Sequence, residues 1–236
     1  MKAKLREIFC SVQGEGPLLG VRQVFIRFDA CNIACEYCDT GTDFKNCRVE
    51  KTPGKGDFHY IENPISYEQT EKIAKSFSRV HSYSLTGGEP LINAEFIKKL
   101  SLKPLYLETN MTLPEKAEII KNKVKFVAGD FKLSFAINNE NYEDIREATI
   151  RSFKILRNSK TRYTFAKIVV GRRIDMDEIY NNLESIKDYI SLAVIQPVTP
   201  LEKAPARGEL LNLQKELSEI VELRIIPQTH KFLNFL

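Results

Sequence analysis

The chain has 236 residues, of which 43% are hydrophobic and 28% are charged, and its formal net charge is +4. This length is sufficient for one sizeable core, and no run of about 18 apolar residues predicts a membrane span. Lys and Arg are interleaved with Asp and Glu, which excludes a dedicated nucleic-acid binder. The polar start MKAKLREIFCSVQ does not resemble a signal peptide. We therefore expect a cytoplasmic protein with neither a nucleic acid nor a membrane as a partner.

Short apolar runs, rich in β-branched and aromatic residues, alternate with segments of helical periodicity. The predicted strands are 24–28, 83–85, 105–108, 124–130, 164–170, 192–197 and 223–226. Apolar residues recur every three or four positions in the stretches 176–190 and 210–220, and more loosely in 142–156, which predicts helices there. Ser66, Asn93 and Pro114 are start signals for three further helices.

This alternation predicts an α/β fold, and more specifically an incomplete (β/α) barrel of about six to seven parallel strands. We expect residues 1–236 to form a single domain, with an insertion at about 41–64 that has no firm periodicity. In such folds the reactive groups collect at the carboxyl ends of the strands. The loops after the predicted strands should therefore share one face.

Three cysteines follow the first predicted strand with the spacing C-x3-C-x2-C, at Cys31, Cys35 and Cys38. Thiolates on a short loop bind iron–sulfur clusters, and three ligands leave one iron open to a group that is not protein. The alternative is a zinc site with a fourth ligand from elsewhere, although no second C-x2-C pair occurs. The candidates for that ligand are Cys10, Cys47 and His59.

The cysteine loop resembles the defining motif of the radical S-adenosylmethionine (SAM) superfamily, in which a [4Fe–4S] cluster binds SAM. The segment TGGEP at residues 86–90 resembles the GGEP element of that superfamily. The elements SVQGEG, ETN, DFKLS, IQP and PQTHK are similar, in the same order, to those of the 7-carboxy-7-deazaguanine synthases. The resemblance implies a Mg²⁺-dependent ring contraction of 6-carboxy-5,6,7,8-tetrahydropterin to 7-carboxy-7-deazaguanine, with loss of ammonia, in deazapurine (queuosine or archaeosine) biosynthesis.

The resemblance also assigns roles to particular residues. The residues implied to bind the pterin are Val12, Gln13, Gly14, Glu15, Arg27, Thr86 and His230. Those implied to bind SAM are Tyr37, Asp39, Gly88, Glu89, Lys132, Leu133, Ser134 and Gln196. Thr40 is implied to help hold Mg²⁺, Glu15 to pair with the guanidine-like edge of the pterin, and Glu89 to meet the SAM ammonium group.

For several of these residues the sequence also allows a purely structural interpretation. SVQGEG is typical of a Gly-rich turn, Thr40 of a loop and His230 of a surface or capping position. Arg27 is a charge among apolar strand neighbours, which suits a fork that binds a carboxylate or, alternatively, an exposed strand face.

Two of the departures from the family pattern are single residues. Ala30 stands where the family more often has glycine, and Met111 replaces the glycine of the more usual ETNGT, so we expect Met111 to alter a loop. The rival functions are an activase for a glycyl-radical enzyme, an iron–sulfur electron carrier and an enzyme for a related pterin. As partners, the resemblance implies a reductant such as flavodoxin and a second copy of the chain in a homodimer.

Overall fold

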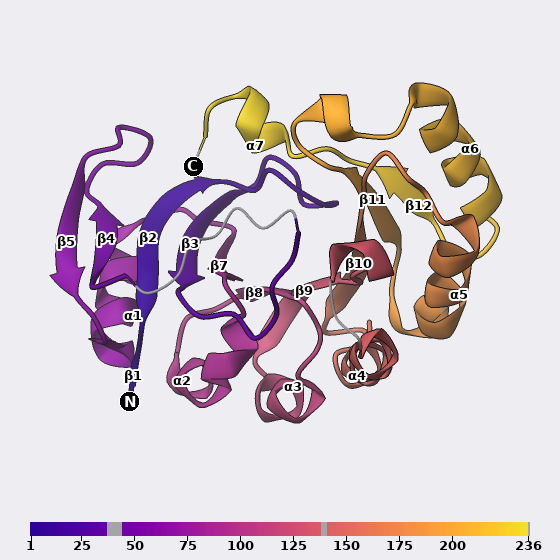
Figure 1. The fold of residues 1–236 in the computed structure, drawn as a ribbon. Coiled ribbons are helices and arrows are strands. Elements are labelled where there is room, and N and C mark those ends of the chain that lie inside the picture. Colours follow the sequence, from indigo (N-terminus) through magenta and orange to yellow (C-terminus); the bar gives the residue numbers. More distant parts are fainter. Residues whose placement is uncertain (37–43, 138–140, 236) are drawn as a thin grey trace.

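The computed structural model describes residues 1–36, 44–137 and 141–235. Its main sheet has the strand order β12-β11-β10-β9-β8-β7-β3-β2-β4-β5. All neighbours from β3 to β12 are parallel, and the sheet curves into an open, incomplete barrel (Figure 1). The parallel strands are β3 (Arg22–Phe28), β7 (Ser82–Gly87), β8 (Leu105–Thr109), β9 (Val124–Asp130), β10 (Tyr163–Val170), β11 (Ala193–Pro197) and β12 (Leu223–Ile225). The predicted fold class is confirmed.

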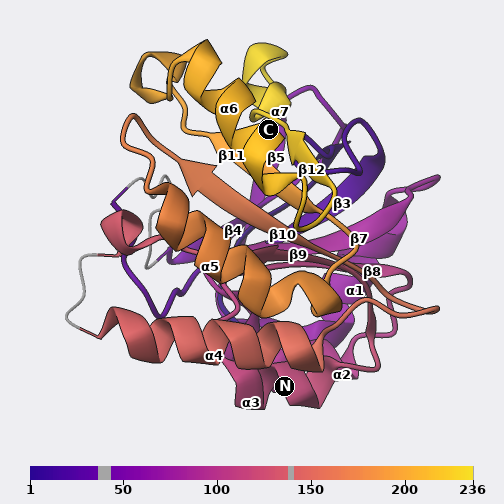
Figure 2. The same cartoon turned by 90° about the vertical axis from the view of Figure 1, so that its right-hand side faces the viewer.

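The larger helices lie along the outer, convex side of this sheet (Figure 1). They are α1 (Tyr67–Ser76), α2 (Ala94–Lys99), α3 (Pro114–Ile120), α4 (Tyr142–Ile155), α5 (Met176–Ile186) and α6 (Arg207–Leu217). Figure 2 shows α4 and α5 packed side by side. Two of the predicted helix starts are confirmed. Ser66 caps α1 by accepting a hydrogen bond from the Gln69 amide at 3.2 Å, and Pro114 is the first residue of α3. Asn93 precedes α2 without a side-chain cap.

Three further strands extend the sheet beyond the predicted set. β2 (Leu5–Val12) is antiparallel to β3, and β4 (Asn46–Glu50) and β5 (Phe58–Glu62) complete this edge. The described part of the insertion, 44–64, is therefore a hairpin of the sheet. β1 (Lys2–Ala3) and β6 (Ile65–Ser66) form a separate small sheet.

The core has a large apolar cluster between the sheet and the helices, as expected of parallel strands that are covered. A smaller cluster of Tyr106, Ala128, Phe165, Leu192 and Val194 forms a second buried layer of the same strands. The small α7 (Thr229–Phe232) lies apart from the outer helices, near β2 and β3 (Figure 1). No helix within the described ranges is long and apolar enough to cross a membrane.

Candidate active site

The carboxyl ends of the parallel strands surround a cavity of about 750 Å³. Most of the residues predicted from the sequence line it: Val12, Gln13, Gly14, Glu15, Arg27, Cys31, Cys35, Thr86, Gly88, Lys132, Gln196 and His230. Glu89, Leu133 and Ser134 are not part of this lining. Tyr37, Cys38, Asp39 and Thr40 lie outside the described residues. The fold thus brings residues from both ends of the chain to one cavity.

The TGGEP turn at the end of β7 packs directly on the backbone that leads into the cysteine loop. The Gly88 amide donates to the Phe28 carbonyl at 2.9 Å, and the Glu89 amide donates to the Ala30 carbonyl at 2.7 Å. A Cβ atom on Gly88 would lie 2.1 Å from the Ala30 carbonyl oxygen. Gly87 has φ +103°, and a Cβ there would lie 2.4 Å from the Phe28 carbonyl oxygen. Two glycines are therefore required for this close approach.

Glu89 is fully buried beneath the turn. Its carboxylate accepts hydrogen bonds from the amides of Leu91 (2.9 Å) and Asn110 (2.7 Å) and from the Thr109 hydroxyl (2.8 Å). Burial raises the pKa of Glu89 to about 7, against the lowering effect of these hydrogen bonds. In this structure Glu89 joins the TGGEP turn to the ETN loop. Its carboxylate is not presented to the cavity, which differs from the role implied by the resemblance.

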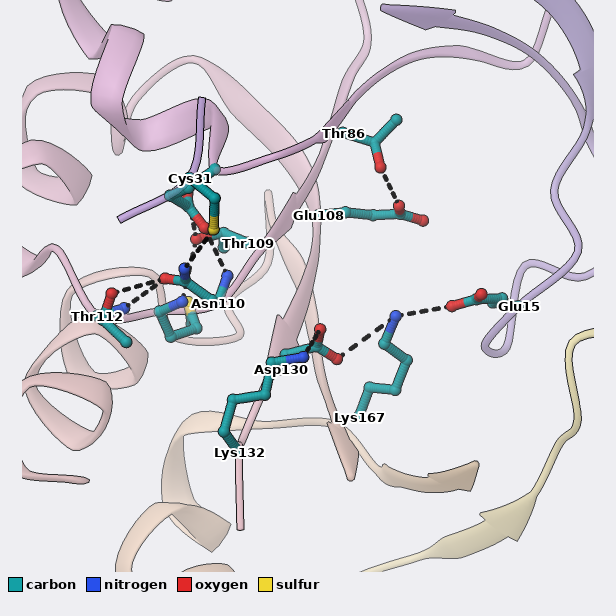
Figure 3. Close-up of polar contacts among 12 residues, drawn as sticks. Glu15, Cys31, Thr86, Glu108, Thr109, Asn110, Thr112, Asp130, Lys132 and Lys167 are labelled. Atoms are coloured by element: carbon teal, nitrogen blue, oxygen red, sulfur yellow. Dashed lines mark hydrogen bonds and ion pairs between the residues drawn. The ribbon is translucent and has the colours of Figure 1, made fainter. Parts of the chain in front are cut away.

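Asn110 lies next to the first cysteine of the loop (Figure 3). Its Nδ2 lies 3.8 Å from Cys31 Sγ and 3.0 Å from Asn32 Oδ1. Its Oδ1 accepts hydrogen bonds from the amide and the hydroxyl of Thr112, at 3.1 and 2.7 Å. Because the oxygen is fixed by Thr112, the NH₂ group must point toward the cysteine loop.

Met111, the departure from ETNGT, has φ +59°, a backbone conformation that favours glycine. Its side chain is fully buried and reaches the neighbourhood of Gly129, where an added Cβ would lie 2.9 Å from Met111 Cε. The methionine therefore occupies a backbone conformation that glycine adopts without strain, and its side chain adds a core contact. An altered loop relative to ETNGT stays a prediction.

Gln13 and Glu108 organise one end of the cavity. The Gln13 Nε2 atom donates to Glu108 Oε1 at 3.0 Å and to Gln23 Oε1 at 3.1 Å. Its Oε1 accepts a hydrogen bond from the Glu15 amide at 3.0 Å. Thr86 Oγ1 donates to the other Glu108 oxygen at 2.5 Å. The amide of Gln13 thus has a fixed orientation, set by Gln23 on β3, Glu108 on β8 and the backbone of Glu15.

A line of alternating charges crosses the cavity (Figure 3). Lys167 Nζ lies 2.7 Å from Glu15 Oε2 and 3.4 Å from Asp130 Oδ1. Lys132 Nζ lies 2.8 Å from Asp130 Oδ2. The second Glu15 oxygen accepts a hydrogen bond from Gln228 Nε2 at 2.7 Å. Burial alone raises the pKa of Glu15, but Lys167 outweighs it and lowers that pKa to about 2, so Glu15 is ionised at neutral pH.

Arg27, on β3, extends its guanidinium group to the cavity wall. Its Nε lies 3.4 Å from Glu7 Oε1, and its guanidinium carbon lies 5.3 Å from the centre of the Phe9 ring. The buried Nε makes no hydrogen bond within the described part of the chain. Glu7 is almost fully buried and also pairs with Arg48. The guanidinium is thereby held at the wall, where it can bind a carboxylate.

The segment before and within α7 closes the cavity on the side of SVQGEG. The Thr229 amide and hydroxyl donate to the Gly14 carbonyl at 2.9 and 3.1 Å. A Cβ on Gly14 would lie 2.2 Å from His230 Nδ1, and a Cβ on Gly16 would lie 2.8 Å from the Phe165 ring. Burial lowers the pKa of His230, so this imidazole is neutral at neutral pH. The glycines of SVQGEG therefore make room for His230 and Phe165.

Comparison with known proteins identifies the family. The model of the radical SAM superfamily matches residues 25–189. The 7-carboxy-7-deazaguanine synthase of Archaeoglobus fulgidus is 44% identical over 99% of both chains, and that of Geobacter sulfurreducens is 38% identical over 98% of this chain and 97% of its own. The chain belongs to the radical SAM superfamily and, within it, to the 7-carboxy-7-deazaguanine synthase family. Among solved structures, QueE from Escherichia coli has the same fold, with a TM-score of 0.60 and 20% identity over 98% of this chain and 95% of that one.

The residues of this radical SAM protein fit the cofactors of its superfamily, a [4Fe–4S] cluster and SAM. The thiols of Cys31 and Cys35 lie at the cavity, and thiolates are the usual cluster ligands. Gln196 lines the cavity, and its buried Oε1 has no hydrogen-bond partner within the described residues. Such an acceptor is costly unless a ligand donates to it, and SAM offers N–H and O–H donors.

Two residues of the DFKLS element lie apart from this cofactor site. Leu133 is buried in the core. Ser134 is exposed, and its amide and hydroxyl donate to Glu178 at 2.6 and 3.0 Å. Of the three residues implied for SAM in this element, Lys132 is the one that lines the cavity.

The three candidate fourth ligands of a zinc site lie away from the cavity lining. Cys10 and Cys47 are buried in β2 and β4, Arg22 Nε lies 3.2 Å from Cys10 Sγ, and burial raises the pKa of Cys47 to about 12. His59 lies on β5 at the sheet edge. In residues 1–36, 44–137 and 141–235, no three His, Cys, Asp or Glu side chains form a metal-binding group.

Lys167, Asp130 and Glu108 were missed as site residues by the sequence reasoning. Lys167 is the one charge in the apolar strand YTFAKIVV, and the same argument singled out Arg27. Asp130 and Glu108 lie at the carboxyl ends of predicted strands. A systematic search for buried charges and strand-end carboxylates could have found all three.

Proposed function

We propose that the chain converts 6-carboxy-5,6,7,8-tetrahydropterin into 7-carboxy-7-deazaguanine with loss of ammonia. One observation carries this proposal: a single cavity holds the cysteine thiols together with the amide of Gln13, the ionised carboxylate of Glu15 and the guanidinium of Arg27. A carboxylated pterin has a guanidine-like edge, ring amides and a carboxylate. Each of these has a complementary partner among those three side chains.

When bound, the reduced cluster and SAM supply the radical that removes a hydrogen atom from C6 of the pterin. The residues of the chain bind and orient the substrate for that step. Glu15 accepts hydrogen bonds from the guanidine-like edge, and Arg27 binds the carboxylate at the other end of the ring. Both Nε2 hydrogens of Gln13 are engaged by Glu108 and Gln23, so Gln13 would accept a hydrogen bond from a ring N–H through the remaining lone pair of Oε1. Two anchored ends fix one C–H bond in position, and such positioning is worth several orders of magnitude in rate.

Mg²⁺ is the third cofactor of the proposal. Its anchor would be Thr40, which lies outside the described residues. Magnesium prefers oxygen ligands and retains several waters, so the Thr40 hydroxyl and the substrate carboxylate would be suitable ligands for it. In that place it would orient the carboxylate during rearrangement.

The proposal extends to the setting of the reaction. A reductant such as flavodoxin would deliver the electron, the protein would act in the cytoplasm, and two copies would form a homodimer. The reductant and the homodimer rest on the resemblance to the family.

Anaerobic turnover tests the proposed function. The reconstituted protein is incubated with SAM, dithionite, Mg²⁺ and the tetrahydropterin, and products are followed by mass spectrometry. We expect 7-carboxy-7-deazaguanine from the wild type and from Cys47→Ala, a cysteine buried away from the cavity. Cys35→Ala should give none.

The other outcomes separate the rival functions. Cleavage of SAM while the pterin returns unchanged would refute the substrate but retain the radical chemistry, as for an activase or an enzyme of a related pterin. A cluster that forms but never cleaves SAM would point to an electron carrier.

A further inference from the structure

Lys167 is a buried cation between two carboxylates. It lies on β10, and its side chain is only 10% exposed. Its Nζ contacts Glu15 at 2.7 Å and Asp130 at 3.4 Å. Burial alone lowers the pKa of Lys167, but Asp130 and Glu15 raise it well above its usual value. Lys167 therefore carries a positive charge at neutral pH.

Glu15 depends on this cation for its own charge. Its carboxylate accepts a hydrogen bond from Gln228 Nε2 at 2.7 Å, and its backbone amide donates to Gln13 Oε1 at 3.0 Å. A carboxyl group this deeply buried would hold its proton if the neighbouring ammonium were removed. Gln228 donates to one oxygen only, and a neutral amide does not compensate a buried charge.

The other ionisable groups around Glu15 do not replace Lys167. Those that face this part of the cavity are Asp130 on β9, Glu108 and Tyr106 on β8, and His230 on α7. Arg27 on β3, Lys132 after β9 and Lys231 on α7 line the same cavity. The two acids oppose ionisation of Glu15, and burial keeps the imidazole and the Tyr106 hydroxyl neutral by lowering the pKa of His230 and raising that of Tyr106. Arg27 and Lys132 are paired with Glu7 and Asp130, and Lys231 is exposed to solvent.

We propose that Lys167 is a positioning residue for the pterin: it holds the Glu15 carboxylate ionised and directed at the guanidine-like edge of the ring. A carboxylate accepts two parallel N–H donors, whereas a neutral acid presents a proton toward one of them. The inference rests on the proposed function. The control of the Glu15 charge by Lys167 does not depend on the substrate and can be measured on the free protein.

The first test therefore needs no substrate. Melting temperatures of the cluster-loaded protein are measured between pH 5 and 8 for the wild type, Lys167→Met and the double variant Glu15→Gln/Lys167→Met. In Lys167→Met the folded-state pKa of Glu15 lies above its unfolded value, so the folded state binds more protons than the unfolded state, and stability falls as the pH rises. We expect the melting temperature of Lys167→Met to fall with rising pH relative to that of the wild type. The double variant should not show this fall. Lys167→Gln provides a second single variant if Lys167→Met does not fold.

The second test measures binding of the tetrahydropterin by anaerobic calorimetry, with SAM present and no reductant. Between pH 6.5 and 8.5 the wild-type affinity should be nearly constant, because Glu15 is ionised and His230 is neutral. In Lys167→Met the affinity should fall as the pH falls, by about tenfold per pH unit below the new pKa of Glu15. Lys167→Arg should restore the flat profile, and Glu15→Gln/Lys167→Met should bind weakly without a slope. Lys154→Met, on the exposed face of α4, should match the wild type.

The outcomes distinguish the two proposals. If Lys167→Met has the wild-type pH profile of melting and of binding, the role of Lys167 is refuted. If its melting profile changes as expected but the wild type does not bind the pterin, the control of Glu15 by Lys167 stands and the proposed substrate fails.

Discussion

The carboxylate of Glu89 accepts a hydrogen bond from the backbone amide of Asn110 at 2.7 Å, although the two residues belong to loops after different strands. The same carboxylate also binds the amide of Leu91 within its own turn. Glu89 therefore fixes the distance between the TGGEP turn, which contacts the cysteine loop backbone, and the ETN loop, which contacts Cys31. The geometry of the cysteine loop depends on this buried contact.

Replacement of Glu89 should remove a pH dependence of stability. The folded pKa of about 7 exceeds the unfolded value of 4.5, so the folded state binds the extra proton and stability falls as the pH rises from about 4.5 to 7. Glu89→Gln, which cannot titrate, should lack this slope in denaturant unfolding measured across that range. An unchanged slope in Glu89→Gln would show that Glu89 is already ionised at low pH in the folded protein.

Gly88→Ala should displace the cysteine loop. The new Cβ would lie 2.1 Å from the Ala30 carbonyl oxygen, and backbone cannot move aside as a flexible side chain can. We expect much lower iron and sulfide content after reconstitution, with loss of SAM cleavage. Gly208→Ala is the matched control, because a Cβ there meets nothing within 4 Å and alanine has a higher helix propensity than glycine. Full cluster loading in Gly88→Ala would contradict the prediction.

Asn110→Ala should make the cluster harder to reduce. The Asn110 NH₂ group lies 3.8 Å from Cys31 Sγ, and N–H donors to cluster sulfurs stabilise the more negative, reduced state. The midpoint potential, measured by redox titration followed by electron paramagnetic resonance, should shift to more negative values. Asn181→Ala, on the exposed face of α5, should leave it unchanged. A potential equal to that of the wild type in Asn110→Ala would exclude this electrostatic role.

Met111→Gly should destabilise the protein even though glycine suits the backbone. Relief of the positive φ is worth about 1–2 kcal/mol, whereas removal of a buried methionine side chain costs about 2–5 kcal/mol. The free energy of unfolding should therefore fall by about 1–3 kcal/mol in chemical denaturation. Arg79→Gly is the comparison, because Arg79 has φ +56° and an exposed side chain, and its replacement should stabilise by about 0.5 kcal/mol. A stabilised Met111→Gly would mean that the core contact contributes little.

The parallel half of the fold could be predicted from the sequence because its strands are continuous apolar runs. β9 has the predicted limits, 124–130, and β10 and β11 differ by one residue at one end. The strand β2 was missed because Arg6 and Glu7 interrupt its apolar pattern. Glu7 is buried there since Arg27 and Arg48 pair with it, and such pairing exists only in three dimensions. The β4–β5 hairpin was also missed, because β5 consists of exposed and half-buried residues and has no continuous apolar run.

The site could be predicted in part, because its loops carry sequence motifs. Motifs located the cysteine loop, the TGGEP turn and the SVQGEG loop, and most of the residues proposed from them line the cavity. They did not give the direction of each side chain: Glu89 is buried against the ETN loop and Ser134 faces Glu178. Lys167 belongs to none of the quoted motifs, and its importance follows from the two carboxylates that the fold places beside it.

The contact between Thr229 and the Gly14 carbonyl has a consequence for how the protein is made. Residues 13–15 are synthesised early and residues 228–230 late, whereas Cys31, Cys35, the TGGEP turn and the ETN loop all precede residue 113. The two partners of this contact are 215 positions apart in the sequence. The wall that receives the pterin is therefore completed only after the growing chain has been synthesised as far as Thr229.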